Sequence, residues 1–351
     1  MKHRLNCLSW ARILGIFLVT GMSLVFASCW HPPFSPEVSA SLLTSEKLGK
    51  PVWQVKVRLP YNARGGYYLP SRYNYNSGMW TSREPDRLQL MGFWYDSALM
   101  KGMIDNYIDI PVQGITNLLV LPSAGNQNVF FFTYPGFNRW GSIDYSNGSF
   151  NASPSYDGTM VGTGFRFGDD GANDKDTLYW AAMSNNEITL YELAVDGNDT
   201  TFNSISTIGT YSSLPPVLPA AISFAALGPD NGLYISGTLQ DGSVVTYRWK
   251  SLTENPEQLQ IDKPLTGMLA DGRLMADTRD RLYLYTPDGS SGFVISTGAL
   301  HFSYERYDSA QSRWIAVFTR TLEIPVSNSD GWDYLISVYE IPADQLETIA
   351  F

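Results

Sequence analysis

The sequence predicts an all-β fold built from four-stranded antiparallel sheets that repeat along the chain. Short apolar runs come in adjacent pairs joined by turn residues, as expected for β-hairpins. The first runs of these pairs begin at residues 177, 232, 273 and 313, which is a spacing of 40 to 55 residues. No window of the domain keeps apolar residues at helical spacing over three turns. These observations favour a repeated β architecture.

The paired runs are clearest in the C-terminal half of the chain. Their turns carry Asn-Asn, Asp-Gly or Ser-Asp-Gly, which suit hairpin backbones that need positive φ. We expect hairpins at 177–184 with 187–196, 232–239 with 243–252, 273–280 with 281–289, and 313–322 with 333–342. Further strands are expected before the pairs at 160–167, 221–227, 265–270 and 298–307, and after two of them at 201–211 and 291–297.

The run at 177–184 is apolar on both of its alternating faces, with Trp180 on one and Tyr179 on the other. A sheet with one wet face would alternate apolar and polar residues. Four-stranded sheets covered on both faces, at this repeat length, resemble the blades of a β-propeller. The resemblance covers residues 160–342 well and 50–160 poorly, and it includes no repeated Trp-Asp dipeptide, no kelch double glycine and no full Asp-box. A β-sandwich or two β domains remain the alternative.

The region before residue 160 is less regular but contains the same kind of short strand. We expect strands at 51–59, 78–82, 88–95, 103–112, 117–122, 128–134 and 139–145. With the four later units this gives six blades, and seven is the alternative. The run at 51–59 is expected to pair with the last unit, which would remove free sheet edges. The predicted propeller domain spans 51–345, and 346–351 form a tail with at most a short helix.

Residues 1–28 have the three-part plan of a secretory signal: a basic start, an apolar run at 13–26 and two small residues before Cys29. As a helix the apolar run would rise ~21 Å, against a hydrocarbon core of ~30 Å, so it would span poorly. A cysteine after small residues resembles the lipobox of bacterial lipoproteins, although Phe26 stands where Leu is usual. The resemblance implies cleavage before Cys29 and acylation of its thiol and new amine. The alternatives are an uncleaved anchor and a plain signal peptide with a chance cysteine.

Cleavage at this site would leave Cys29 as the only cysteine, because Cys7 is removed with the signal. The mature chain would then contain no disulfide, and residues 29–50, rich in Pro and Ser, would form a tether. Its 21 basic and 34 acidic residues give a net charge of −13, which argues against nucleic acid as a partner. In enteric lipoproteins an Asp after the cysteine favours the inner membrane. Trp30 at this position therefore favours an exported, lipid-anchored protein of the outer membrane, on either face.

Few residues offer catalytic or metal-binding chemistry. His301 is the only histidine of the domain, and its apolar neighbours predict a satisfied, partly buried side chain. The acidic loop at 167–176 has oxygen ligands for calcium but lacks EF-hand spacing, so turn residues are the preferred interpretation. A carboxylate pair for glycoside cleavage would leave no local motif. We expect no cofactor, no metal site and no catalytic residue.

The stretch 61–80 has the most unusual composition in the domain, because it combines aromatic residues and arginines with Gly, Pro and Asn. Tyr, Trp and Arg contribute strongly to binding interfaces. We therefore predict a recognition loop for a protein or glycan, with the tyrosines packing beneath the loop as the alternative. The predicted binding residues are Arg64, Tyr67, Tyr68, Arg72, Tyr73, Tyr75 and Trp80. A second candidate surface is 133–142, where Trp140 is expected to begin a strand.

These observations lead to one expectation and two alternatives. The expectation is a lipoprotein that is anchored in the membrane through Cys29 and whose non-catalytic propeller binds a protein or glycan through its loops. The first alternative is a periplasm-facing scaffold for envelope assembly. The second is a propeller glycosidase or lyase that uses Asp or Glu.

Overall fold

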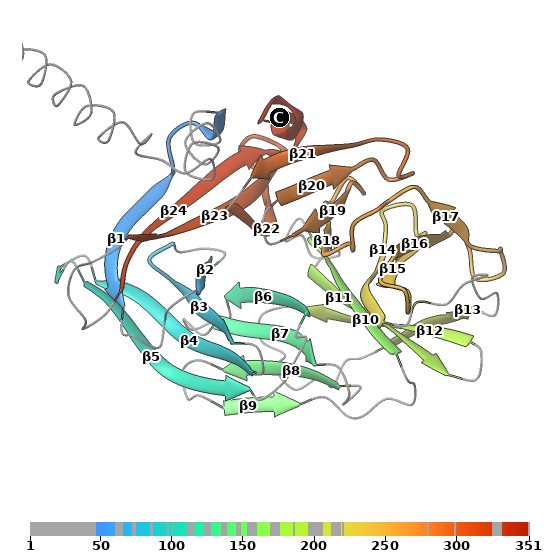
Figure 1. The fold of residues 1–351 in the computed structure, drawn as a ribbon, viewed down its shortest axis with the longest axis horizontal. Coiled ribbons are helices and arrows are strands. Elements are labelled where there is room, and N and C mark those ends of the chain that lie inside the picture. Colours follow the sequence, from blue (N-terminus) through green and yellow to red (C-terminus); the bar gives the residue numbers. More distant parts are fainter. Residues whose placement is uncertain are drawn as a thin grey trace, which may run out of the picture. The chain divides into compact units, whose positions relative to one another are not determined.

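In the part of the chain that it describes, the computed structural model has six four-stranded antiparallel sheets (Figure 1). Five of them are formed by four consecutive strands, and the sixth combines the first strand with the last three. The structure describes residues 47–349 except 60–65, 72–74, 85–86, 97, 100, 111–115, 123–127, 135–138, 145–148, 153–159, 169–175, 185–186, 196–205, 212–218, 220, 279–280, 298–299 and 325–331.

The strands of the N-terminal half form two complete sheets, and β1 belongs to a third sheet together with the last three strands of the chain. The strands are β1 Trp53–Leu59, β2 Tyr67–Pro70, β3 Ser77–Glu84, β4 Arg87–Asp96, β5 Lys101–Ile110, β6 Thr116–Pro122, β7 Asn128–Tyr134, β8 Arg139–Asp144 and β9 Ser149–Ala152. Strands β2 to β5 form one sheet and β6 to β9 the next.

The C-terminal half follows the same plan. Its strands are β10 Met160–Arg166, β11 Asp176–Ser184, β12 Glu187–Val195, β13 Ser206–Tyr211, β14 Ala221–Leu227, β15 Leu233–Thr238, β16 Val244–Trp249, β17 Glu257–Leu259, β18 Gly267–Met268, β19 Leu274–Asp277, β20 Arg281–Tyr285, β21 Gly292–Thr297, β22 Leu300–Asp308, β23 Arg313–Ile324 and β24 Trp332–Pro342. A 3-10 helix, η2 Ala343–Ile349, follows β24. All four hairpins predicted in this half are confirmed.

Strand β1 pairs with β24, which joins the two ends of the domain (Figure 1). The register runs from Trp53 opposite Val338 to Leu59 opposite Trp332. Arg58 Nε donates to Asp333 at 2.6 Å across this pair, and that hydrogen bond lowers the pKa of the Asp333 carboxyl. The predicted pairing of 51–59 with the last unit is therefore confirmed. Consecutive four-stranded sheets, the last completed by the first strand, form a β-propeller.

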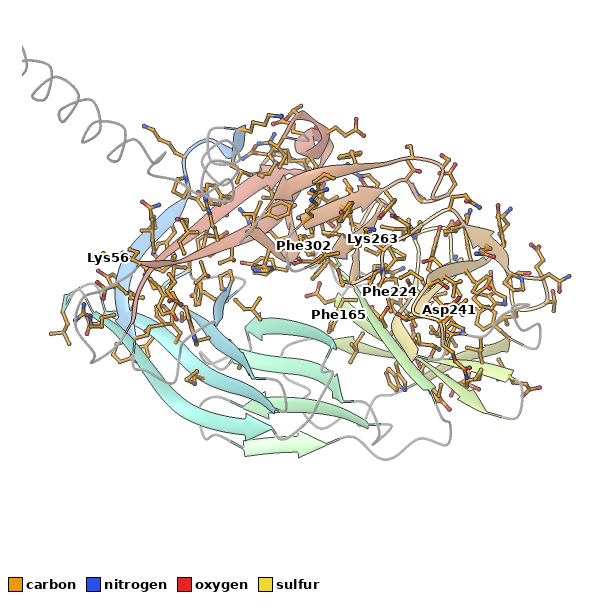
Figure 2. All side chains as sticks on the ribbon, in the orientation of Figure 1. Lys56, Phe165, Phe224, Asp241, Lys263 and Phe302 are labelled. Carbon is orange, nitrogen blue, oxygen red and sulfur yellow. The ribbon has the colours of Figure 1, made fainter. Side chains whose placement is uncertain are left out.

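The sheets bury both faces, as the pattern at 177–184 predicted. On β11, Trp180 belongs to one core cluster and Tyr179 to another. On β23, Val317 belongs to the first cluster and Phe318 to a third. Phe302, labelled in Figure 2, packs against the first and third clusters. Residues of several sheets make up each core cluster, and both faces of these strands are covered, which explains why the sequence of β11 does not alternate apolar and polar residues.

Two hairpin turns of the C-terminal half share one geometry. In the β15–β16 turn, Asp241 Oδ1 accepts the N–H of Ser243 at 2.9 Å, and Gly242 has a φ of +85° (Figure 2). In the β18–β19 turn, Asp271 Oδ1 accepts the N–H of Arg273 at 3.0 Å, and Gly272 has a φ of +87°. The Asp side chain fixes the turn while glycine adopts the left-handed backbone.

Three short strands were not expected, and one lies in the predicted recognition loop. They are β2, β9 and β17, which have four, four and three residues. The interpretation of the stretch 61–80 as a loop is wrong at Tyr67–Pro70, where β2 lies, whereas the strand expected at 78–82 corresponds to β3. Helix η2 buries Leu346 and Ile349 in the third cluster, so the expected domain boundary at 345 falls inside a packed element.

Candidate functional site

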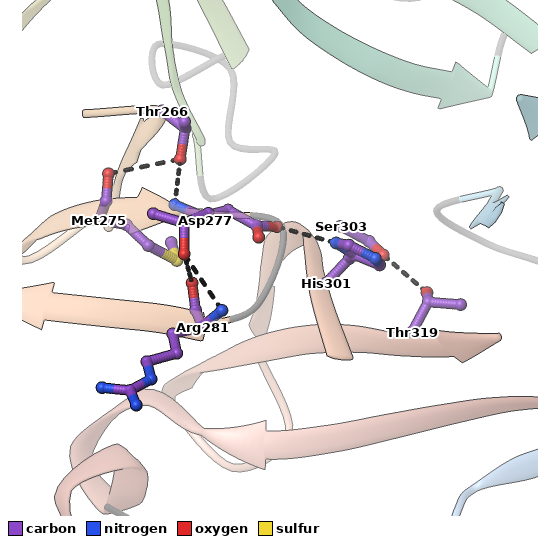
Figure 3. Close-up of polar contacts among 8 residues, drawn as sticks. Thr266, Met275, Asp277, Arg281, His301, Ser303 and Thr319 are labelled. Atoms are coloured by element: carbon purple, nitrogen blue, oxygen red, sulfur yellow. Dashed lines mark hydrogen bonds and ion pairs between the residues drawn. The ribbon is translucent and has the colours of Figure 1, made fainter. Parts of the chain in front are cut away.

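A polar cluster around His301 lies where two sheets meet (Figure 3). His301 is near the start of β22, and Asp277 is the last residue of β19 in the neighbouring sheet. His301 Nδ1 lies 3.2 Å from Asp277 Oδ2, and the two side chains are 26% and 22% exposed. The prediction of a satisfied, partly buried histidine is confirmed. Both groups remain accessible to a ligand at the surface.

Backbone and hydroxyl contacts hold Asp277 in place. Its N–H donates to Thr266 Oγ1 at 2.8 Å, and the Thr266 hydroxyl donates to the carbonyl of Met275 at 3.4 Å. The turn that follows is closed by the Thr278 hydroxyl, which donates to the Arg281 carbonyl at 2.8 Å. The carboxylate therefore approaches the histidine from a rigid strand end.

A second pair of hydroxyls continues the cluster on β22 and β23. Ser303 Oγ and Thr319 Oγ1 lie 2.7 Å apart and both side chains are buried. The ladder between the two strands shifts register between Phe302 and Tyr304, so Ser303 occupies a bulge. We name the set Thr266, Asp277, Arg281, His301, Ser303 and Thr319 the His301 cluster.

A third sheet reaches the same region through β2. The N–H of Tyr68 donates to Thr321 Oγ1 at 3.1 Å, and Thr321 is two residues beyond Thr319 on β23. Strand ends from three sheets therefore meet near the His301 cluster. Such convergence of partly exposed polar groups on rigid strands is typical of a recognition site.

The chemistry of the His301 cluster suits hydrogen bonding to a polar ligand. It offers an imidazole, a carboxylate and hydroxyls, while Arg281 contacts Thr278 through its backbone and extends its exposed side chain away from His301 (Figure 3). A Ser-His-Asp mechanism requires a serine hydroxyl that donates to the histidine. Ser303 is the cluster's only serine, and its hydroxyl is engaged with Thr319. Among the described residues, no three His, Cys, Asp or Glu side chains gather as a metal site would require.

The described aromatic residues of the stretch 61–80 pack between sheets. Tyr68 and Trp80 are fully buried, which supports the packing alternative for these two residues. Trp80 meets the Tyr334 ring edge-on at 4.6 Å between ring centroids, and the centroid of the Tyr68 ring lies 5.9 Å from that of Trp53 on β1. These side chains stabilise the contact between the sheet β2–β5 and the sheet that contains β24.

Tyr75 forms a second contact between these two sheets. Its hydroxyl donates to Glu340 on β24, and Arg306 Nη2 donates to the other oxygen of the same carboxylate at 3.0 Å. Burial and the hydrogen bond to Glu340 both raise the pKa of Tyr75. Tyr75 is therefore a neutral donor, and its side chain is half-buried.

Other predicted site residues fall outside the described part of the chain. They are Cys29, Arg64, Arg72 and Tyr73, and of Tyr67 only the backbone, in β2, is described. The acidic loop is described only at its ends, where Asp176 accepts the N–H of Gly168 at 2.9 Å. In the second candidate surface, Trp140 lies in β8 as expected.

Sequence reasoning missed two carboxyl groups near β22. Asp277 lies 24 residues from His301 and in another sheet, so no local motif links them. Glu305 is four residues after His301 and fully buried, although its sequence neighbours Tyr304 and Arg306 gave no sign of this. Only the packing of sheets reveals either residue.

None of the helices in the described part of the chain has the length and apolar character needed to span a bilayer. No protein-family model matches the sequence, and no curated protein does.

Several solved structures are similar to this chain at low identity. TolB from Acinetobacter baumannii is 13% identical over 78% of this chain and 64% of its own length, with a TM-score of 0.36. A mutant of AofleA from Arthrobotrys oligospora is 13% identical over 82% of this chain and 92% of its own, with a TM-score of 0.39. Regucalcin, a calcium-binding protein from Agrobacterium tumefaciens, is 10% identical over 82% of this chain and 97% of its own length, with a TM-score of 0.38.

These neighbours are β-propellers, and this chain spans less than two thirds of the length of that TolB. At these TM-scores the similarity carries no argument about activity, ligand or partner. The fold assignment rests on the strand pairing described above.

Proposed function

We propose that this protein is a lipid-anchored, non-catalytic β-propeller that binds a protein or glycan partner at the sheet ends around the His301 cluster. The observation that carries the proposal is the meeting of strand ends from three sheets at partly exposed polar groups. Polar and aromatic groups on a rigid scaffold favour recognition without chemistry.

The anchoring is supported by the sequence around Cys29 and by where the domain begins. The tether and the residues that lead into β1 number 23, from 30 to 52, so an extended chain would reach about 80 Å. The domain would therefore stay near the membrane but turn freely. With Trp30 after the cysteine, we propose the outer membrane as its location.

The partner surface includes part of the predicted recognition stretch. Arg64 precedes β2 in the chain and Tyr67 is its first residue, whereas Arg72 and Tyr73 follow this strand. The start of β2 is also where Tyr68 bonds to Thr321. We therefore assign Arg64 and Tyr67 to the same binding surface as the His301 cluster. Tyr68 and Trp80 support that surface from the core.

Site-specific photocrosslinking in living cells tests this surface. A photoreactive amino acid replaces Arg281, which is exposed at the start of β20. The matched control replaces Ser290, which is exposed in the turn after the same strand and thus at its opposite end. We expect a discrete adduct from position 281 and none from position 290. Equal adducts from both positions, or none from 281, would contradict the assigned surface.

A further inference from the structure

Glu305 is the most completely buried carboxyl group among the described residues. Its side chain is 0% exposed, and it lies on β22 opposite Ala316 of β23. Oε2 accepts the N–H of Ala270 at 2.6 Å, but Oε1 is buried without a hydrogen-bond partner. A buried carboxylate with a single donor is poorly compensated, so this arrangement favours the neutral acid.

Charged residues on the elements around Glu305 can raise or lower the pKa of its carboxyl group. They are Asp271 and Arg273 on the β18–β19 turn, Arg313, Arg320 and Glu323 on β23, Asp333 and Glu340 on β24, Asp344 and Glu347 on η2, and His301, Arg306 and Asp308 on its own strand. Burial raises the pKa of Glu305 to about 8, and Asp271 adds to this rise. The Ala270 N–H and Arg273 oppose it without overcoming it.

Arg273 connects this carboxyl group to the C-terminal helix. Its Nη2 donates to the carbonyl of Ala343, the first residue of η2, at 2.6 Å. Its Nε donates to Asp271 Oδ2 at 2.7 Å. The same guanidinium thus holds the turn and the helix while Glu305 is neutral. It is also the nearest cation that an ionised Glu305 could recruit from this turn.

We propose that Glu305 is a proton-controlled latch for the β18–β19 turn and helix η2. While the carboxyl group carries its proton, Ala270 and Arg273 hold the turn and the helix against β22. When the proton leaves, the buried negative charge draws Arg273 away from Ala343. The helix then loosens, and its buried residues Leu346 and Ile349 separate from the third core cluster.

The direction of the pH dependence follows from the two states. An exposed glutamate has a pKa near 4.5, whereas the closed state holds its proton up to pH of about 8. Between these values the closed state binds a proton that the open state has lost, so opening becomes easier as pH rises. Below pH 4.5 both states bind the proton and the latch is closed, whereas above pH of about 8 neither state binds it and the proton no longer stabilises the closed state.

Hydrogen exchange measured by mass spectrometry on the full chain tests the latch. Protection factors, corrected for the intrinsic effect of pH, are compared between pH 6 and pH 8 for peptides covering 266–273 and 343–349. We expect these factors to fall roughly tenfold or more, because one pKa unit corresponds to a factor of ten. Peptides covering β15 and β16 should keep constant protection factors.

Two variants separate the latch from general instability. Glu305→Gln stays neutral at every pH, so its protection factors should not depend on pH. The matched control Glu257→Gln, at an exposed position, should behave as the wild type. If the Gln variant does not fold, Asp271→Asn keeps the turn hydrogen bond and removes one negative charge. Loss of the Asp271 charge lowers the pKa of Glu305, and Arg273, released from its ion pair, acts in the same direction. The opening transition of this variant should therefore occur at a lower pH than in the wild type.

The proposal is overturned if wild-type protection of the two peptides does not change with pH. It is also overturned if Glu305→Gln retains the wild-type pH dependence, or if Asp271→Asn leaves the midpoint of the transition unchanged.

Discussion

Glycine has one role in the sheets β14–β17 and β18–β21 and another in the segment 66–80. In the two sheets, Gly242 and Gly272 have positive φ and occupy turns that the adjacent aspartates fix. In the segment, Gly78 lies on β3, where a Cβ atom would collide with the Leu69 carbonyl oxygen and lie 2.8 Å from the Tyr68 ring. A turn glycine follows from its neighbours in sequence, whereas a packing glycine follows only from tertiary contacts.

The largest expected effect comes from removing an aromatic anchor of the segment. Trp80→Ala deletes a fully buried ring that contacts Tyr334 between two sheets. We expect the free energy of unfolding to fall by about 3–5 kcal/mol in urea denaturation. Trp94→Ala is the control, because Trp94 is 37% exposed on the neighbouring strand β4 and should cost clearly less. Equal losses from both would contradict the packing role of the segment.

An added methyl group tests the packing glycine. Gly78→Ala should reduce the free energy of unfolding by about 1–3 kcal/mol, because the tight contact with Leu69 and Tyr68 must open. In Gly267→Ala the new Cβ would lie 3.7 Å from the nearest side-chain atom, so this control should be nearly neutral. Thermal or urea unfolding of the two variants makes the comparison. A harmless Gly78→Ala would show that this glycine is not required for packing.

The smallest expected effect concerns a turn glycine. Gly242→Ala places a side chain at a φ of +85° with no atom within 4 Å of the new Cβ, so only backbone strain acts. We expect a loss of about 1 kcal/mol in the free energy of unfolding. Gly242→Asn should lose less, because asparagine tolerates the left-handed region. If alanine and asparagine cost the same, strain at this turn does not explain the glycine.

Much of the fold could be predicted from the sequence where turn residues join two adjacent apolar runs. The expected hairpin at 232–239 and 243–252 corresponds to β15 and β16, with ends shifted by a few residues. The apolar faces of β11 indicated sheets packed on both sides. Strands of three or four residues, such as β2 and β17, leave too short a pattern to recognise.

The candidate site was harder to predict from the sequence, because its side chains come from different sheets. His301 was recognised as a satisfied histidine, but its partner Asp277 was not. The dense Tyr, Gly and Asn of 61–80 indicated a recognition loop, while in the structure Tyr68 and Trp80 are buried in sheet contacts. Composition reports which residue types are present, and only the register of neighbouring strands determines which of them face solvent.

The central claim is that a propeller is held at a membrane through Cys29. Metabolic fatty-acid labelling of wild type, Cys29→Ala and Cys7→Ala in living cells tests it most directly. We expect label on the wild type and on Cys7→Ala, since residue 7 lies in the predicted signal, and no label on Cys29→Ala. Label that persists on Cys29→Ala, or is absent from the wild type, would contradict the lipid anchor and the location proposed from it.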